Sequence, residues 1–223
     1  SNEVSLFTRP RRFGKTLMMS MMESFFSIQK GDSHDVFDGL DIMEHSEFCD
    51  QWMNKFPVLY VTLKGVEALS FEDAYKTLMV KLADLCKAQE NLTENDKIDR
   101  DDRQIFLNLK SQQASMENVK GSLKTLMRML YTVYEKPVIL LIDEYDVPLA
   151  KASEQNTEKN QYYVKMLDVI RGMFDAALKG NEYLQFAVIT GCLRIAKESI
   201  FTGTNNFTSY SVLDDDFSGY FGF

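Results

Sequence analysis

The sequence of 223 residues is long enough for one large or two small cores, and its composition, 45% apolar and 26% charged, is that of an ordinary soluble globular protein. A formal net charge of −8 argues against general nucleic-acid binding, which requires a basic face. Three scattered cysteines and the lack of an apolar run of roughly 20 residues lead us to expect a cytoplasmic protein with reduced thiols and no membrane segment.

The first predicted element is a short apolar strand over residues 3–8, which runs into a polar loop and then into a helix. The helix opens at Gly14-Lys15-Thr16, and apolar residues recur along it at helical spacing. A strand, a loop and a helix in this order are typical of a phosphate-binding P-loop, where backbone N–H groups and the positive end of the helix dipole converge on an anion. We expect Lys15 to reach the β- and γ-phosphates and the Thr16 hydroxyl to contact Mg²⁺.

The loop departs from the usual pattern, which has a glycine five residues before Gly14. This chain has Arg9 there, so the loop must turn by another route, for which we name Pro10, whose φ is fixed near −65°. The alternative is a chance Gly-Lys-Thr at a helix start, so the motif needs partners downstream. If it is a P-loop, the residues expected to bind the nucleotide are Arg11, Arg12, Phe13, Gly14, Lys15, Thr16 and Leu17.

A near-continuous apolar run over residues 56–63 predicts a strand buried on both faces of a parallel sheet. A capping-box pattern at Ser70 predicts that a helix begins there, and further helical patterns follow within residues 105–134. The methionines on these apolar faces are read as core residues. We interpret residues 64–136 as a helical insertion between the second and third strands.

The second signature is an apolar run from Pro137 that ends in two adjacent acids, Asp143 and Glu144. A buried strand delivers such carboxylates to the C-terminal edge of an α/β sheet, where ligands bind. We expect Asp143 to hold Mg²⁺, directly or through water, and Glu144 to polarise the attacking water. The alternative is a strand that ends in an acidic turn by chance, which the upstream Gly-Lys-Thr weakens.

A helical pattern through residues 162–177 leads to another apolar strand, 184–191, which ends in Thr190 and a glycine. In an ATPase of this architecture a polar residue here lies between the acids and the γ-phosphate, so we expect Thr190 to sense that phosphate. Arg194 is a second candidate for phosphate contact, with an ordinary surface arginine as the alternative. Residues 207–213 alternate enough to predict a last strand.

Helices that alternate with apolar strands require right-handed crossovers and a parallel sheet covered on both faces. We therefore predict an α/β P-loop NTPase with a five-stranded parallel sheet. The extra strand between the phosphate loop and the acidic strand matches the ASCE branch, which keeps a catalytic glutamate beside its Mg²⁺ aspartate. Both ends look cut, because the first strand starts almost at once and residues 217–223 form an aromatic-rich tail. We treat residues 1–223 as one domain of a longer protein.

Three stretches, residues 7–17, 141–149 and 190–201, resemble the bacterial AAA-ATPase-like family, and the run Arg-Pro-Arg-Arg-Phe-Gly-Lys-Thr is specific to it. The resemblance covers nearly the whole chain and implies that arginine in place of glycine at position 9 is a regular feature of the family. It also implies a STAND-like signalling NTPase, often followed by a C-terminal nuclease-like domain of the PD-(D/E)XK type.

The main functional hypothesis is Mg²⁺-dependent ATP binding with slow hydrolysis, which makes the chain a nucleotide-driven switch or regulatory ATPase. Its expected partners are the nucleotide and, in the full-length chain, a second copy or the nuclease-like domain, with no membrane contact and no direct nucleic-acid binding. One alternative is a module that does not hydrolyse nucleotide and serves as a scaffold for a partner or a fused nuclease. A weaker alternative is a small-molecule phosphotransferase, although the adjacent acids favour water as the acceptor.

Overall fold

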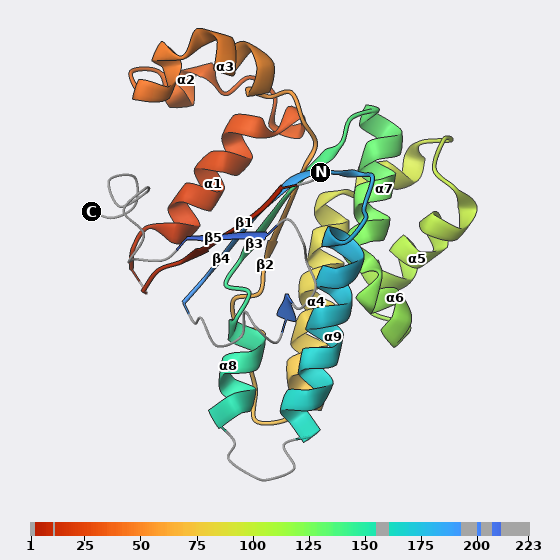
Figure 1. Ribbon diagram of the computed structural model, residues 1–223. Coiled ribbons are helices and arrows are strands. Elements are labelled where there is room, and N and C mark those ends of the chain that lie inside the picture. The colour runs from red at the N-terminus through yellow and green to blue at the C-terminus, as the bar shows by residue number, and fades with distance from the viewer. Residues whose placement is uncertain (1–2, 11, 155–160, 193–199, 202–206, 211–223) are drawn as a thin grey trace.

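The computed structural model describes residues 3–10, 12–154, 161–192, 200–201 and 207–210 (Figure 1). Its strands are β1 (Glu3–Thr8), β2 (Val58–Thr62), β3 (Val138–Asp143), β4 (Leu184–Gly191) and β5 (Phe207–Tyr210). Its α-helices are α1 (Lys15–Phe26), α2 (His34–Phe37), α3 (Ser46–Trp52), α4 (Phe71–Ala88), α5 (Arg100–Lys110), α6 (Met116–Lys120), α7 (Ser122–Tyr134), α8 (Val147–Glu154) and α9 (Gln161–Leu178). Short 3₁₀ helices are η1 (Ile28–Lys30), η2 (Asp41–Glu44) and η3 (Glu90–Glu94).

The strands form one sheet in the order β2-β3-β4-β1-β5, and every neighbouring pair is parallel. Four strands, from β2 to β1, carry the long ladders, and β5 adds a short strand at the edge beside β1. β4 lies between β1 and β3, so the strand that ends in Thr190 separates the strand before the loop from the acidic strand. The α/β class and the all-parallel sheet predicted from the alternating pattern are confirmed.

Helices lie on both faces of the sheet, but unevenly (Figure 1). On one face α4, α7 and α9 enclose the larger core, which takes Leu6 from β1 and Leu140 from β3. On the other face α1 packs over a smaller core, which takes the next residues, Phe7 and Leu141. Successive strand residues point to opposite faces, so β3, which is buried on both sides, forms a continuous apolar run before Asp143.

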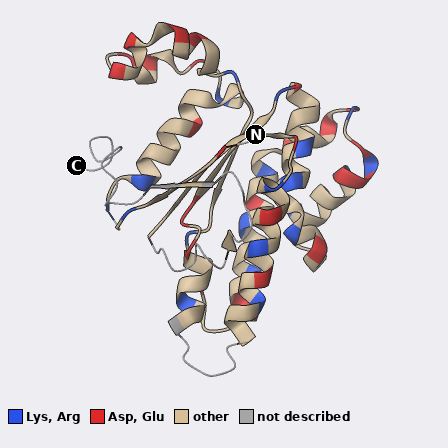
Figure 2. Ribbon diagram, in the orientation of Figure 1, with Lys and Arg blue, Asp and Glu red and all other residues tan. Residues whose placement is uncertain are grey.

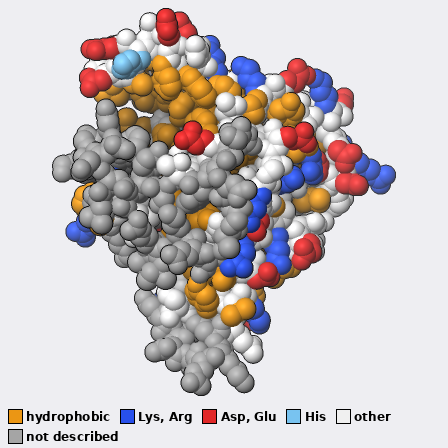
Figure 3. All heavy atoms as spheres, viewed as in Figure 1, with side chains coloured by type: hydrophobic (Ala, Val, Ile, Leu, Met, Phe, Trp, Pro, Cys, Tyr) orange, Lys and Arg blue, Asp and Glu red, His pale blue; other side chains and the backbone are white. Residues whose placement is uncertain are grey.

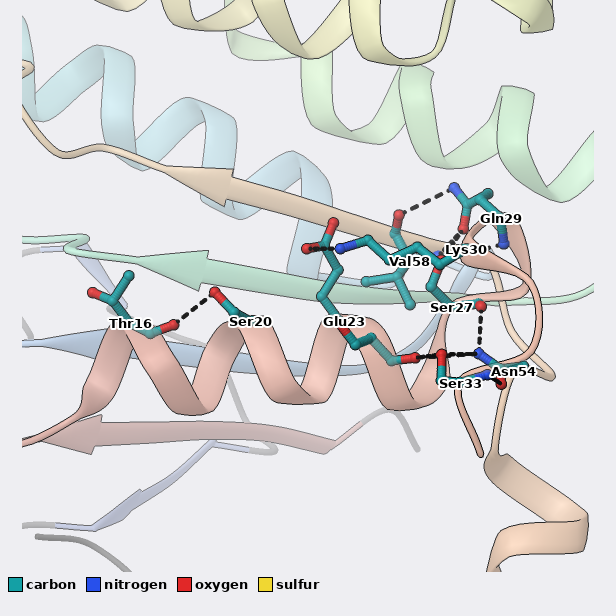
Figure 4. Close-up of polar contacts among 10 residues, drawn as sticks. Thr16, Ser20, Glu23, Ser27, Gln29, Lys30, Ser33, Asn54 and Val58 are labelled. Atoms are coloured by element: carbon teal, nitrogen blue, oxygen red, sulfur yellow. Dashed lines mark hydrogen bonds and ion pairs between the residues drawn. The ribbon is translucent and has the colours of Figure 1, made fainter. Parts of the chain in front are cut away.

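Side-chain amides tie the C-terminal end of α1 to β2 (Figure 4). Asn54 Nδ2 donates to the carbonyl oxygens of Ser24 at 3.2 Å and Ser27 at 2.9 Å. Gln29 Oε1 accepts from the Val58 N–H at 2.9 Å, and Gln29 Nε2 donates to the Val58 carbonyl at 3.3 Å. The glutamine thus pairs with the outer edge of β2 as a neighbouring strand would, and it fixes the direction of α1 relative to the sheet.

Between β2 and β3 the chain forms α4 to α7. The Ser70 hydroxyl caps α4 by accepting the Asp73 N–H at 3.2 Å, as its position predicts. The predicted helix through residues 119–134 is divided at Gly121 into α6 and α7. Arg128 of α7 donates Nε–H to Asp102 of α5 at 2.7 Å, which joins the two helices.

Sequence reasoning made no prediction for α8, which has Pro148 in its first turn, where proline is tolerated. The predicted last strand, 207–213, is described as β5 only to Tyr210, and its remainder lies outside the described residues. Within the part of the chain that the structure describes, no helix has the length and apolar character to cross a membrane.

Candidate nucleotide-binding site

Three elements bring hydroxyl and carboxylate groups together at the C-terminal edge of the sheet. The Thr16 hydroxyl, in the first turn of α1, donates to Asp143 Oδ2 at 2.8 Å. The Thr190 hydroxyl, near the end of β4, donates to the other carboxylate oxygen, Asp143 Oδ1. Asp143 and Thr190 are buried. Residues that sequence reasoning assigned to the metal and to phosphate sensing therefore share one carboxylate.

Tyr60 of β2 is a further neighbour of this carboxylate that sequence reasoning missed. Burial raises the pKa of Tyr60 to about 12, and the negative charges of Asp143, Glu23 and Glu144 and a hydrogen bond with Asp143 add to the shift. The phenol therefore stays protonated at neutral pH. Tyr60 pairs with Leu141 in the β2–β3 ladder, two residues before Asp143, so strand register could have predicted this contact.

The Lys15 side chain turns back into its own loop. It is only 7% exposed, and its Nζ donates to the carbonyl oxygens of Arg9 at 2.8 Å and Pro10 at 2.7 Å. A longer contact, 3.5 Å, joins Nζ to Cys192 Sγ, which follows β4. The ammonium group thus lies between the start of the loop and the end of β4, within the same edge of the sheet as Asp143.

The loop turns through two residues with positive φ. Arg12 has φ 69°, and Gly14, the N-cap of α1, has φ 70°. The expected route through Pro10 is therefore corrected: the left-handed turn is made after it. Glycine adopts this conformation freely, whereas a residue with a Cβ pays roughly 1–2 kcal/mol there, so Arg12 holds a strained backbone.

Glu144 follows β3 with φ 56° and is half-buried. Burial raises its pKa above the ordinary value, and the carboxylates of Asp143 and Asp146 raise it further, while Lys64 and Lys15 oppose the shift. A carboxylate whose pKa is shifted towards neutrality is a better proton acceptor at neutral pH than an unperturbed one.

A cavity of about 710 Å³ opens over the loop and the acidic turn, within the size range of small-molecule sites. Its lining includes most of the residues that sequence reasoning assigned to nucleotide binding and water activation: Arg12, Phe13, Gly14, Lys15, Thr16, Leu17 and Glu144. Arg11 and Arg194 lie outside the described residues. The lining also includes residues that sequence reasoning missed, namely Lys64, Gly65, Glu67, Asp146, Val147, Ala150 and Cys192.

The turns that follow β3 and β4 are joined closely. Both carboxylate oxygens of Asp146 accept the Cys192 N–H at 3.2 Å, and the Tyr145 N–H donates to the Thr190 carbonyl at 3.1 Å. A Cβ added to Gly191 would overlap the Tyr145 ring and approach Asp146 Oδ1 to 2.7 Å. Only glycine therefore permits this approach, which explains the glycine at the end of β4.

The donor set fits a hard divalent cation that arrives with phosphates. Thr16 and Asp143 supply neighbouring hydroxyl and carboxylate oxygens, and Mg²⁺ is usually held by one or two carboxylates together with substrate phosphates and water. Among the described residues no group of three or more His, Cys, Asp or Glu side chains could hold a metal ion by itself. The Thr16 and Asp143 oxygens would thus supply only part of the coordination of such a cation, and phosphates and water would supply the rest.

The parallel sheet and the loop-to-helix junction beside the acidic strand are consistent with a P-loop NTPase-like domain. The family model "Predicted AAA-ATPase" matches residues 1–201, and the chain belongs to this family, which confirms the resemblance seen in the sequence and suggests nucleotide binding. An uncharacterized protein in the vnfD 5' region of Azotobacter chroococcum mcd 1 is 24% identical over 216 residues. The alignment covers 97% of this chain and 35% of that relative, so the chain spans about a third of the relative's length. No solved structure matches the chain significantly.

Proposed function

We propose that this chain binds ATP with Mg²⁺, hydrolyses it slowly and acts as a nucleotide-driven switch or regulatory ATPase of the ASCE branch. The observation that carries the proposal is the shared Asp143 carboxylate, which accepts hydrogen bonds from the hydroxyls of Thr190 and of Thr16, the residue that follows Lys15. Membership of a family described as predicted ATPases supports the same chemistry.

In this proposal each residue has one role. Lys15, the loop N–H groups and the positive end of α1 bind the phosphates, while Thr16 and Asp143 hold Mg²⁺. The ion, when bound, neutralises charge on the β- and γ-phosphate oxygens. Glu144 takes the proton of the attacking water, and Thr190 senses the γ-phosphate through Asp143. Contacts of Arg11 and Arg194 with the phosphates remain part of the proposal.

Low turnover is expected of this chain alone, because enzymes of this kind often take an arginine from a neighbouring subunit or domain. We propose that the regulated partner is a second copy or a nuclease-like domain on a longer chain. The greater length of the Azotobacter relative is compatible with further domains.

A second candidate is a binding module or scaffold that does not hydrolyse nucleotide. The position of the Lys15 ammonium, held by the carbonyls of Arg9 and Pro10, favours it, because phosphate binding must replace those contacts. A loop with this internal competition binds phosphate more weakly than one with an unengaged lysine.

Calorimetric titration with ATP, in the presence and absence of Mg²⁺, separates a nucleotide-binding chain from a pure scaffold. The proposal expects Mg²⁺-dependent heat in the natural chain, loss of that heat in Lys15→Ala, and unchanged heat in the control Lys76→Ala, whose side chain is largely exposed on α4. GTP in place of ATP tests the preference for the base. A chain that gives no Mg²⁺-dependent heat contradicts nucleotide binding and leaves the scaffold.

Phosphate release tests hydrolysis. Loss of a general base typically costs about 10²- to 10⁴-fold in rate, so Glu144→Gln should bind ATP and release phosphate at least about 100-fold more slowly. Glu72→Gln, an exposed glutamate of α4, is the matched control. Equal rates of phosphate release in the natural chain and in Glu144→Gln would contradict the proposed role of Glu144 in hydrolysis. They would leave the proposal of ATP binding unaffected.

A further inference from the structure

An apolar groove runs along α1, on the face of the sheet opposite to α4, α7 and α9. Two cavities of about 550 and 370 Å³ share the lining residues Met22, Phe26 and Phe48, so they form one groove, which we call the α1 groove. The first part lies between α1 and the α2–α3 segment, and the second lies over β1 and β4 beside α3. Figure 3 shows hydrophobic side chains gathered next to the acidic α2–α3 segment.

Large apolar side chains in this groove are open to solvent. Met21 of α1 and Phe48 of α3 are each 40% exposed. Figure 2 shows few charged residues along α1, whereas the helices on the opposite face carry many. A contiguous apolar surface of this kind marks an interaction site rather than an ordinary solvated face.

The topology of the sheet explains why fewer helices lie on this face. The crossover from β1 to β2 places α1 on one face, whereas the crossovers from β2 to β3 and from β3 to β4 run back along the sheet and place their helices on the other. α1 packs mainly on β2 and β3. On β4, Phe186 contacts the rim of the helical layer, through the rings of Phe26 of α1 and Trp52 of α3. Parallel sheets are normally covered on both faces, and the exposed side chains of Met21 and Phe48 leave an apolar surface on this face that a further segment can cover.

We propose that residues 211–223 of this chain are that segment and that they dock in the α1 groove. The segment begins directly after Tyr210, which pairs with Phe7 in the β1–β5 ladder, and Phe7 itself lines the groove. Thirteen residues, 211 to 223, span up to about 43 Å when extended, so reach is no obstacle.

The composition of the segment matches the groove. It carries four aromatic residues within seven positions, and each aromatic side chain can bury roughly 150–250 Å². Gly219 and Gly222 separate these aromatics and let the chain pass close to the helix surface. Methionines of α1 supply adaptable contacts for aromatic rings. The aromatic residues proposed to enter the groove are Phe217, Tyr220, Phe221 and Phe223.

Trp52, the single tryptophan of the sequence, lines the groove and reports on its occupant. We compare the natural chain with a variant in which the four tail aromatics are replaced by serine, and measure Trp52 emission and its quenching by acrylamide. The proposal expects a red shift and stronger quenching in the variant. Leu69→Ser, at a site 81% exposed and outside the groove, should leave both unchanged. Unchanged emission and quenching in the tail variant overturn the proposal.

A second measurement keeps the tail aromatic and does not depend on the folding of the serine variant. A photo-reactive benzoylphenylalanine in place of Phe221 should cross-link within one chain to α1 or α3, as mapped by mass spectrometry of peptides. Intramolecular cross-links to any other element overturn the proposal. Cross-links between chains, or Trp52 quenching that depends on protein concentration, also overturn it, because the occupant would then be a second copy. Neither measurement requires nucleotide, so the result is separate from that for ATP binding.

Discussion

Thr190 on β4 donates its hydroxyl hydrogen to Asp143 on the neighbouring strand β3, and the second oxygen of the same carboxylate accepts the hydroxyl of Thr16. The carboxylate is buried, so these two hydroxyls replace the water that it would bind in solution. The end of β4 is thereby linked to the first turn of α1 through one side chain.

Replacing Thr190 by valine tests this link. Thr190→Val keeps the shape of the side chain but removes the donor to a buried carboxylate, so we expect the free energy of unfolding to fall by about 1–3 kcal/mol. Thr190→Ser keeps the hydroxyl and should lose less. Urea denaturation of the three proteins measures the difference, and equal midpoints for the natural chain and Thr190→Val would show that the hydrogen bond contributes nothing.

The close contact between the turns after β3 and β4 predicts a second effect. Gly191→Ala places a methyl group against Tyr145 and Asp146, and overpacking of this kind costs about 1–3 kcal/mol or more. Gly121→Ala is the matched control, because Gly121 has φ −82° and its added Cβ would meet only ordinary contacts. Thermal unfolding should separate the two variants, with Gly121→Ala neutral or slightly stabilising. A similar loss in both would point to a general intolerance of alanine.

The ion pair between Asp102 of α5 and Arg128 of α7 should contribute to the free energy of unfolding. Asp102→Asn removes the charge that faces the Arg128 Nε–H at 2.7 Å, and we expect a loss of about 1–3 kcal/mol in the free energy of unfolding. Asp84→Asn breaks an exposed pair with Lys87 on α4 and should change stability by less than about 0.5 kcal/mol. Denaturant titration of both variants provides the measurement, and equal effects would contradict the assigned contrast.

The three cysteines should differ in reactivity. Burial raises the pKa of Cys86 to about 12, partly opposed by the charge of Lys110, so its thiolate is scarce in the folded chain. Iodoacetamide at pH 8 should therefore label Cys192, which is half-buried beside Lys15, well before the buried Cys86 and Cys49. Mass spectrometry of peptides gives the order, and labelling in urea, where all three react, is the control.

The raised pKa of Cys86 also makes the stability of the folded chain depend on pH in a definite direction. An unfolded thiol ionises near about pH 8.5, whereas Cys86 in the folded chain stays protonated towards pH 12. The unfolded state therefore loses its proton first, and the contribution of Cys86 to stability falls as pH rises through this window. Cys86→Ala should show a flatter loss of stability between pH 8.5 and 11, and an unchanged pH profile would refute the assignment.

The sequence was sufficient to predict where the site residues of strands and helices meet. Thr16, Asp143 and Thr190 each lie at the end of a strand or the start of a helix, and in a parallel sheet these ends share one edge, so their proximity follows from topology. The same regularity predicted the sheet and the cap of α4. Residues in turns carry no such period, so Lys64 and Asp146 were missed although both line the cavity.

Backbone conformation inside the loop was also beyond sequence reasoning. Pro10 has a fixed φ and was therefore the visible candidate for the turn, but Arg12 and Gly14 make it with positive φ. Nothing in the side chain of an arginine marks such a conformation, which non-glycine residues adopt rarely.

Helix α1 has twelve residues, about 18 Å of rigid rod, with Lys15 and Thr16 at one end and the side chains of the α1 groove along its flank. A rod of this length does not bend to absorb a displacement, and Asn54 and Gln29 hold its far end. Any tilt that a ligand imposes at the first turn must therefore be transmitted to whatever lies against Met21 and Met22. Such a tilt would turn α1 about its C-terminal end, which the side chains of Asn54 and Gln29 hold in place.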